Sequence, residues 1–470
     1  MGKLLLAVSC YLCFSSALVL AQTNSALDTV ETLTLERAIR IAIDNAIATL
    51  QAKNQYELTG AQLLQAYGQF LPAVTISTTY TPINSNQRIN PTTLPGGQVI
   101  FPLFGQQTTS IGFNLNASLN LFNGLADQAA LQNAIHAREG AGYSLKRAKQ
   151  DIAFSVAQGY LQVLLNQELL HIAQENLKSS QERLRQLREQ ARLGARTIAD
   201  LYQQEAQTVT DELAVIRAEN TLRNSKLALI RQIRLDPAKD YKFEIPPIDT
   251  ALLGAEYQDE SKLILSAQEQ RADLKAAQEN LTATSWSITQ ARSSFLPALN
   301  LNFNLFTNGF NVFRQSFDGN TIPNPVLPSV VEQLGKQISF NVGLQLSWTI
   351  FDRFTTNLRA EQSLINYRNQ ELQYEDLKIR VVTEVRQAIG EYNAAIKQLE
   401  SSSKGLVFAK QAFETVQKRY EVGSATFVEV TTAQAALVRA QSDYAQALFN
   451  FTFQKKVLEY FLGTVDVDAF

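Results

Sequence analysis

Four segments of this 470-residue chain alternate between apolar and polar residues: 72–80, 110–122, 298–306 and 338–351. A period of two puts apolar and polar side chains on opposite faces of a β-strand. The second and fourth segments reach the roughly 9–11 residues that a tilted strand needs to cross a bilayer. Their polar positions carry almost no charge, and aromatic residues lie near several strand ends. This pattern favours membrane strands over the half-buried sheet of a soluble protein.

Most of the remaining chain shows helical periodicity. Apolar residues recur every seven positions from Val156 to Leu184, and the same stripe returns between Val385 and Phe413. A sustained seven-residue repeat predicts supercoiled helices. The pattern predicts helices over six segments: 33–68, 126–194, 197–234, 262–294, 353–421 and 426–463. Each pair of shorter helices matches one long helix in length, so we expect the shorter two to stack end to end against a helix of about 100 Å.

Three landmarks occur twice, in the same order and with nearly the same separation between the two occurrences. Phe70-Leu71-Pro72 returns as Phe295-Leu296-Pro297, and the Leu-Phe-Asn-Gly sequence that ends at Gly124 returns as the Ile-Phe-Asp-Arg sequence that ends at Arg353. A Gly-containing turn followed by an acid, Gly194 with Asp200, returns as Gly423 with Glu429. The landmarks predict two copies of one unit, at 33–246 and 262–463, with a joining segment at 237–261.

Four strands in one chain make an open sheet. The free backbone groups of an open edge cannot be satisfied in hydrocarbon, which admits only helices and closed barrels. We therefore expect the chain to close a barrel by pairing with copies of itself.

The composition excludes several classes of protein. Lys and Arg total 42 against 44 Asp and Glu, a net charge of −2, which argues against a nucleic-acid partner. The chain has only two His and two Cys, and no nucleophile triad, phosphate loop or pair of catalytic carboxylates stands out. We expect no enzyme, no cofactor and no metal, with His136 and His171 as ordinary helix-surface residues that lack a second ligand.

Residues 1–21 have the features of a signal peptide: Lys3, then an apolar stretch, then a cleavage site at Ala21. Both cysteines, Cys10 and Cys13, lie inside it, so a mature chain beginning at Gln22 would contain none. Lipidation of Cys10 is the alternative. No later run of 18 apolar residues predicts a transmembrane helix.

The repeated Phe-Leu-Pro, the Leu-Phe-Asn-Gly after the second strand and the two Gly-containing turns resemble the outer membrane efflux protein family, the TolC-like channel-tunnels. The resemblance covers about residues 33–463. It implies an α+β membrane protein: a homotrimer with a 12-stranded outer-membrane β-barrel, four strands per chain, continued by a long α-helical coiled-coil tunnel in the periplasm. The segment 237–261 would then lie at the equator of the tunnel.

The resemblance also implies a function and partners. The chain would be the exit duct of a tripartite efflux pump or a type I secretion system, in the outer membrane of a Gram-negative-type bacterium. Its partners would be an inner-membrane transporter, a periplasmic adaptor protein and outer-membrane lipid, with no nucleic acid. Two other classes remain open. One is a stand-alone porin-like solute channel, which would not depend on a pump. The other is a soluble coiled-coil scaffold, which would appear in a soluble fraction.

By the same resemblance the periplasmic entrance lies at the two Gly-containing hairpins. Matching positions give gate candidates and adaptor-contact tips; the gate candidates are Asp200, Tyr420, Glu429 and Arg196, and the tips are Leu193, Gly194, Val422 and Gly423. The family's Arg two residues after the second Gly is Ala425 here, and its acid nine residues after that Gly is Thr432.

Plain helix chemistry offers an alternative for these acids. Thr197-x-x-Asp200 and Thr426-x-x-Glu429 are both capping boxes, which begin a helix without any gate. Arg196 and Asp200 are four residues apart, which predicts an exposed ion pair along the helix.

Overall fold

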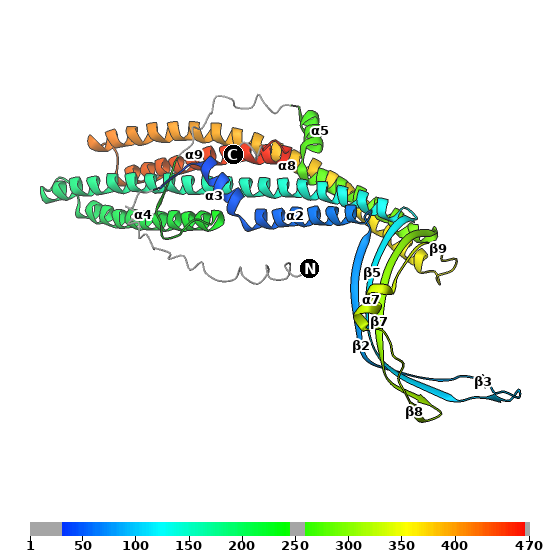
Figure 1. The fold of residues 1–470 in the computed structure, drawn as a ribbon. Coiled ribbons are helices and arrows are strands. Elements are labelled where there is room, and N and C mark those ends of the chain that lie inside the picture. Colours follow the sequence, from blue (N-terminus) through cyan, green and yellow to red (C-terminus); the bar gives the residue numbers. More distant parts are fainter. Residues whose placement is uncertain (1–30, 245–258, 466–470) are drawn as a thin grey trace.

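The computed structural model describes residues 31–244 and 259–465. An elongated helical body lies at one end of the molecule and a long, curved sheet at the other (Figure 1). The predicted signal peptide and most of the segment that joins the two copies lie outside the described residues. Within the described ranges, no helix is long and apolar enough to cross a membrane.

The helical body repeats one arrangement twice. The first copy contains α1 Leu35–Asn45, α2 Ile47–Gly68, α3 Ala126–Arg192 and α4 Ile198–Ile233. The second contains α5 Glu260–Gln270, α6 Ala272–Arg292 with a 3₁₀ turn Ser293–Phe295, α8 Thr355–Glu421 and α9 Phe427–Leu462. The 67-residue α3 packs along α2 and α4, and the 67-residue α8 packs along α6 and α9. Much of the seven-residue stripe is buried there, including Val156, Val163, Val385 and Tyr392.

Two helices that the periodicity predicts as continuous are each broken. The 33–68 helix divides at Ala46, and the 262–294 helix divides at Arg271, where the backbone is extended with ψ of 136° and 125°. The two breaks lie at the same point of each copy. At the second, the buried Arg271 pairs with Asp273 at 2.6 Å and Glu384 at 2.7 Å.

A small parallel pairing, which the sequence pattern does not predict, ties the two ends of the first copy together. β1 Glu31–Leu33 runs beside β6 Tyr241–Phe243, and we call this pair of strands the clasp. The hydroxyl of the buried Tyr160 on α3 lies 2.7 Å from the carbonyl oxygens of both Leu33 and Glu244, and it accepts the Glu244 N–H at 3.0 Å. These contacts anchor the clasp to the long helix.

Four long antiparallel strands form the sheet in the order β2-β5-β7-β9. They are β2 Ala73–Ile89, β5 Leu103–Asn123, β7 Ala298–Phe317 and β9 Ile338–Ser347. Short strands lie at the far end: β3 Thr92–Thr93, β4 Val99–Ile100 and β8 Asn320–Ile322. The helix α7 Val330–Lys336 packs on the middle of β7, where Thr307 donates to the Leu334 carbonyl at 2.7 Å (Figure 1). The first three long strands extend beyond the predicted segments, because pairing continues through residues whose side chains no longer alternate. The chain outside the strands, between 81 and 108 and between 307 and 336, is correspondingly shorter than the sequence pattern implies.

The internal repeat extends to the pairing register. Ala73 pairs with Ser118 between β2 and β5, and Ala298 pairs with Ser347 between β7 and β9. The second pair is displaced from the first by the same offsets that separate the Phe-Leu-Pro and Leu-Phe-Asn-Gly landmarks from their repeats. The β2–β5 pair and the β7–β9 pair therefore have the same register, residue for residue.

The turn from strand to long helix accounts for the Gly124 and Arg353 difference. Both residues have positive φ, of 70° and 57°, and both are followed by a second left-handed residue. A Cβ on Gly124 would lie 2.2 Å from the Ser293 carbonyl oxygen, so only glycine fits there. Arg353 is exposed within the described chain, and a side chain is accommodated at that turn.

Candidate functional site at the hairpin tips

Two helical hairpins end at the extremity of the molecule farthest from the sheet (Figure 1). The first joins α3 to α4 through Gly194, with φ of 73°, and the second joins α8 to α9 through Gly423, with φ of 80°. In each hairpin the residue after the glycine donates its N–H to a carbonyl five residues back, at 2.8 Å: Ala195 to Gln190 and Ser424 to Arg419. These are the bonds of a Schellman motif, which requires a left-handed residue at the glycine.

The tips themselves expose apolar side chains to solvent. Leu193 and Val422 precede the two glycines and are 71% and 80% exposed.

The returning helices begin with the predicted threonine caps, but only the second forms a complete capping box. Thr426 Oγ1 accepts the Glu429 N–H at 3.3 Å, and Glu429 Oε1 accepts the Thr426 N–H at 3.3 Å. Thr197 Oγ1 accepts the Asp200 N–H at 3.2 Å, which is the threonine half alone. The Asp200 side chain is one methylene shorter than glutamate.

Arg196 does not follow the prediction of an ion pair along its own helix. Its Nη2 donates to the Tyr420 carbonyl oxygen at 3.1 Å, and its guanidinium carbon lies 4.0 Å from the centre of the Tyr420 ring. A planar guanidinium can stack and donate at once, so one side chain makes both contacts. Arg196 thus fastens the first hairpin to the second, and we call this contact the tip latch.

Tyr420 is the centre of the latch. Burial raises the pKa of its hydroxyl, Arg196 acts in the opposite direction, and the nearby Asp200 raises that pKa further. The hydroxyl oxygen is buried and has no hydrogen-bond partner among the described residues. The aromatic ring and the backbone carbonyl, rather than the hydroxyl, therefore connect the hairpins within one copy.

Glu429 belongs to a separate set of contacts inside the second hairpin. Its carboxylate caps α9 and lies 3.6 Å from Arg419, whose guanidinium also donates to the Ser424 carbonyl at 2.9 Å. Both side chains of this pair are about half exposed. The structure thus brings Arg196, Asp200 and Tyr420 together, and it keeps Glu429 with its own turn.

A polar network that the sequence analysis missed lies directly behind the latch. Arg183 on α3 donates to Gln434 on α9, Gln434 donates to Asn176 at 2.7 Å, and Asn176 donates to Asp211 on α4 at 3.0 Å. Burial lowers the pKa of Arg183. The small or polar residues spaced between the apolar stripe positions, such as the buried Ser180, were the available signal. Three helices are joined here by hydrogen bonds instead of apolar packing.

His136 is not the isolated surface residue that the sequence predicts. Its Nδ1 lies 2.7 Å from Glu279 on α6 and 3.9 Å from Glu139 on its own helix. The ligand atoms of these three side chains lie within 4.8 Å of one another, which is close enough for them to bind one cation. A hydrogen bond between α3 and α6 accounts for the arrangement without a metal.

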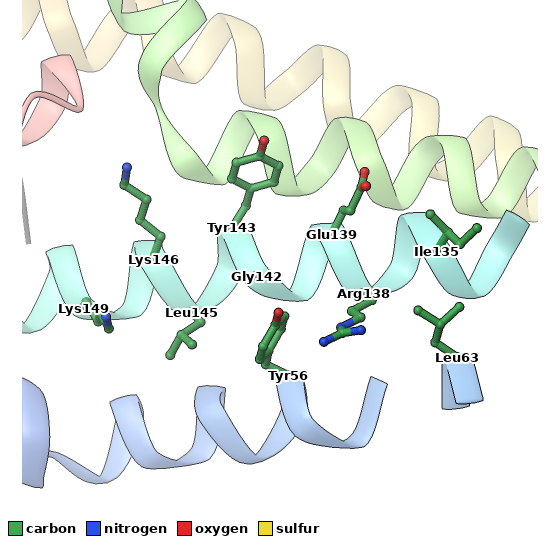
Figure 2. A pocket seen from close by; sticks show the side chains of 10 residues that line it. All are labelled: Tyr56, Leu63, Ile135, Arg138, Glu139, Gly142, Tyr143, Leu145, Lys146 and Lys149. Atoms are coloured by element: carbon green, nitrogen blue, oxygen red, sulfur yellow. The ribbon is translucent and has the colours of Figure 1, made fainter. Parts of the chain in front are cut away.

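Glu139 also borders a groove between α2 and α3, shown in Figure 2. Tyr56 rises from α2, whereas Glu139 and Tyr143 are directed toward α6. Arg138 lies over the Tyr56 ring at 5.4 Å, and Lys275 on α6 lies over Tyr143 at 5.9 Å. The groove is bordered by cation–aromatic contacts between neighbouring helices.

Comparison with known proteins agrees with this architecture. The model of the family described as outer membrane efflux protein matches residues 38–233 and 263–464, one match in each copy. The outer membrane protein TolC of Vibrio cholerae is 26% identical over 323 residues, covering 67% of this chain and 68% of the relative. The pyoverdine export outer membrane protein OpmQ of Pseudomonas putida is 25% identical over 350 residues, covering 72% and 67%.

Solved structures share the fold. The crystal structure of the CmeC outer membrane channel of Campylobacter jejuni has a TM-score of 0.72 at 17% identity, and the match covers 93% of this chain and 88% of that one. The repeated helix–hairpin–helix unit, the sheet and the family match lead to one conclusion. This chain belongs to the outer membrane efflux protein family, the TolC-like proteins, and it is a transport protein of the outer membrane.

Proposed function

We propose that three copies of this chain form the outer-membrane exit duct of a tripartite efflux pump or a type I secretion system. The duct conducts its cargo passively, without catalysis, from an inner-membrane transporter and a periplasmic adaptor to the outside. The observation that carries the proposal is the pair of open sheet edges.

Each edge strand has one free side in the part of the chain that the structure describes. β2 pairs only with β5, and β9 pairs only with β7. The apolar face of β9 is fully exposed, with Phe340 at 72% and Leu344 at 67%. Such edges are stable in a bilayer only when another chain closes them.

The repeat supplies the partner for each edge. β5 pairs with β7 inside one chain, where Leu115 lies opposite Leu305. In the internal repeat, β9 is the equivalent of β5, and β2 is the equivalent of β7. The same pairing between copies therefore places β9 of one copy against β2 of the next, with Leu344 opposite Tyr80. Four strands per chain and three copies, the number that the resemblance implies, give a barrel of 12 strands, within the known range of even strand numbers.

The helical body supports a tunnel that leads to a gated entrance. A helix of 67 residues extends about 100 Å, which carries the hairpin tips deep into the periplasm. We assign the gate to the tip latch of Arg196 and Tyr420 together with the nearby Asp200, and to Glu429 in the turn of the second hairpin. Leu193, Gly194, Val422 and Gly423 form the surface that the adaptor contacts.

A double-cysteine variant tests the assembly. The two cysteines of the sequence lie within the predicted signal peptide, so Leu344→Cys with Tyr80→Cys introduces the reactive pair. Directly opposite side chains on paired strands are close enough for a disulfide after small adjustments. Oxidation in outer-membrane preparations should give covalent trimers on denaturing gels.

The matched control is Leu344→Cys with Thr79→Cys, because a shift of one residue turns the side chain to the other face. Cross-linking of this control alone, or the absence of covalent trimers in both variants, contradicts the proposal. The porin-like alternative is separated by an efflux assay: deletion of the partner transporter should abolish export through this duct, and a stand-alone channel would not respond.

A further inference from the structure

The outer face of α4 carries two stripes of seven-residue period that are largely exposed in the described chain; Glu205, at the tip end, pairs with Arg188 on α3 at 3.0 Å. Tyr202, Val209 and Ile216 form an apolar stripe, each at least 60% exposed. Glu205, Glu212 and Glu219 follow three residues behind them, and the last two are exposed. Positions spaced three and four apart along a helix form one continuous face of the kind used in coiled coils.

The opposite edge of the helical body carries the complementary charge. In the tip half the helices lie in the order α4, α3, α9, α8, so α4 and α8 form the two borders (Figure 1). The face of α8 turned away from α9 exposes Lys397 and Lys404, again seven residues apart, followed by the half-exposed Val407. A basic border and an acidic border on one body can meet only between copies.

The internal repeat sets how the borders meet. Inside one chain α3 packs on α9 in antiparallel fashion, with a hydrogen bond of 2.7 Å from Gln434 to Asn176. Glu168 and Glu175 of α3 share a groove there with Gln441 and Leu448 of α9. In the internal repeat, α8 is the equivalent of α3, and α4 is the equivalent of α9. A contact between α8 of one copy and α4 of the next would therefore repeat the contact of α3 with α9. The groove residues then become Lys397 and Lys404 on one copy, and Glu212 and Glu219 on the next.

We infer that α8 of one copy docks on α4 of the next copy through a charge-paired seam. Lys404 lies beside Glu212 and Lys397 beside Glu219, and Val407 lies opposite Val209. Glu400, the remaining acid of this α8 face, takes the place of His171 and stands between the two lysines. This seam rests on the proposed assembly of copies and adds to it the helical contact and its chemistry.

The charges also select the mode of assembly. Two α4 faces would oppose acids to acids, and two α8 faces would oppose lysines to lysines, so both two-fold pairings are disfavoured. Only the head-to-tail contact of α8 with α4 is complementary, and a head-to-tail contact is the kind that builds a ring when its rotation closes. The corresponding seam inside one chain lacks this pairing, since its two acids face Gln and Leu.

Charge reversal and rescue test the seam. Purified Lys404→Glu protein should dissociate from trimer to monomer at a lower temperature in mild detergent than the parent, as followed on semi-denaturing gels. Lys404→Glu with Glu212→Lys should return the dissociation temperature toward that of the parent, because each chain carries both sides of the seam. Lys410→Glu, an exposed reversal on α8 outside the seam, should leave it unchanged. Equal shifts at positions 404 and 410, or failure of the rescue, overturn the inference.

Cross-linking gives a measurement that does not depend on stability. Lys404→Cys with Glu212→Cys should form covalent trimers, and Lys404→Cys with Glu219→Cys, one heptad out of register, should form far fewer. Covalent trimers from the variant with cysteines at 344 and 80, without any from the variant with cysteines at 404 and 212, would refute the seam but not the proposed duct. Absence of both would refute the duct itself. Cross-linking of position 212 solely to another envelope protein would assign the α4 face to a different partner and refute the seam.

Discussion

The tip latch shows how the side chain of one residue can connect two halves of a duplicated chain. Arg196 comes from the first hairpin, whereas its acceptor carbonyl and its aromatic partner both come from Tyr420 in the second. The position after the second glycine that would mirror Arg196 is Ala425. The first hairpin therefore donates a cation to the second, and the second hairpin has no equivalent arginine with which to contact the first.

Loss of the Arg196 side chain should open the entrance. Arg196→Ala removes a charged hydrogen bond and a cation–π contact, together roughly 1–3 kcal/mol in each copy. We expect a higher single-channel conductance in planar bilayers than for the parent trimer. Arg196→Lys keeps the charge without the planar stack and should lie between the two. Identical conductance of all three proteins would contradict a gating role for the latch.

Removal of the Tyr420 hydroxyl should have little effect. The hydroxyl is buried without a hydrogen-bond partner in the described chain, so Tyr420→Phe loses no bond and retains the ring. The conductance of this variant should equal that of the parent, whereas Tyr420→Ala should behave as Arg196→Ala does. A rise in conductance with Tyr420→Phe would mean that the hydroxyl bonds to a neighbouring copy.

At the scale of elements, periodicity predicted much of the fold and failed at identifiable places. The seven-residue stripe placed the long helices, and the alternating segments placed the core of each long strand. The breaks at Ala46 and Arg271 were missed, because neither carries Pro or Gly and the extended backbone is set by packing. The clasp of β1 and β6 was missed because three-residue strands have no readable period. Arg196 was assigned to Asp200 because local spacing cannot reveal a partner 224 residues away.

The clasp offers a test of stability and pH response. Burial raises the pKa of Tyr160 to about 12, above the ordinary value of 10. A raised folded-state pKa stabilises the folded state at pH below 10, and this contribution is lost as the pH rises from about 10 to 12. Tyr160→Phe should lower stability by about 1–3 kcal/mol, because buried backbone groups lose their partner. Thermal melting followed by circular dichroism should show a lower midpoint at pH 8, and the variant should show a smaller decline than the parent above pH 10, because the raised pKa of Tyr460 remains in both proteins.

The break at Arg271 offers a second test at this scale. Its guanidinium is buried between Asp273 and Glu384, and the equivalent break in the first copy uses Ala46. Arg271→Ala should therefore preserve the break but leave two partly buried carboxylates unpaired, at a cost of about 2–4 kcal/mol. Limited proteolysis should become faster between α5 and α6. Adding Asp273→Asn and Glu384→Gln should recover part of the resistance, and a failure to recover would assign the loss to packing alone.

At the scale of the whole molecule, the proposed duct requires the sheet to meet lipid on one face and water on the other. The exposed apolar face of β9 includes Leu344, and the next residue, Gln345, points to the opposite face. Leu344→Arg should cost roughly 2–4 kcal/mol if the position lies near the bilayer midplane, and Gln345→Arg should cost little. The yield of heat-resistant trimer in the outer membrane reports the difference. Equal losses for both variants would argue against a lipid-facing strand.

The unequal hairpins have a consequence for stoichiometry. Each chain presents two tips of the same backbone geometry, yet only one supplies Arg196 and only the other holds the complete capping box. A ring of three copies would display six tips in strict alternation of two kinds. A partner ring that matched them would contain three members, each bridging two unlike tips, or six members in two alternating environments. A six-membered partner ring of identical subunits would then bind with two distinct affinities, even though all its subunits share one sequence.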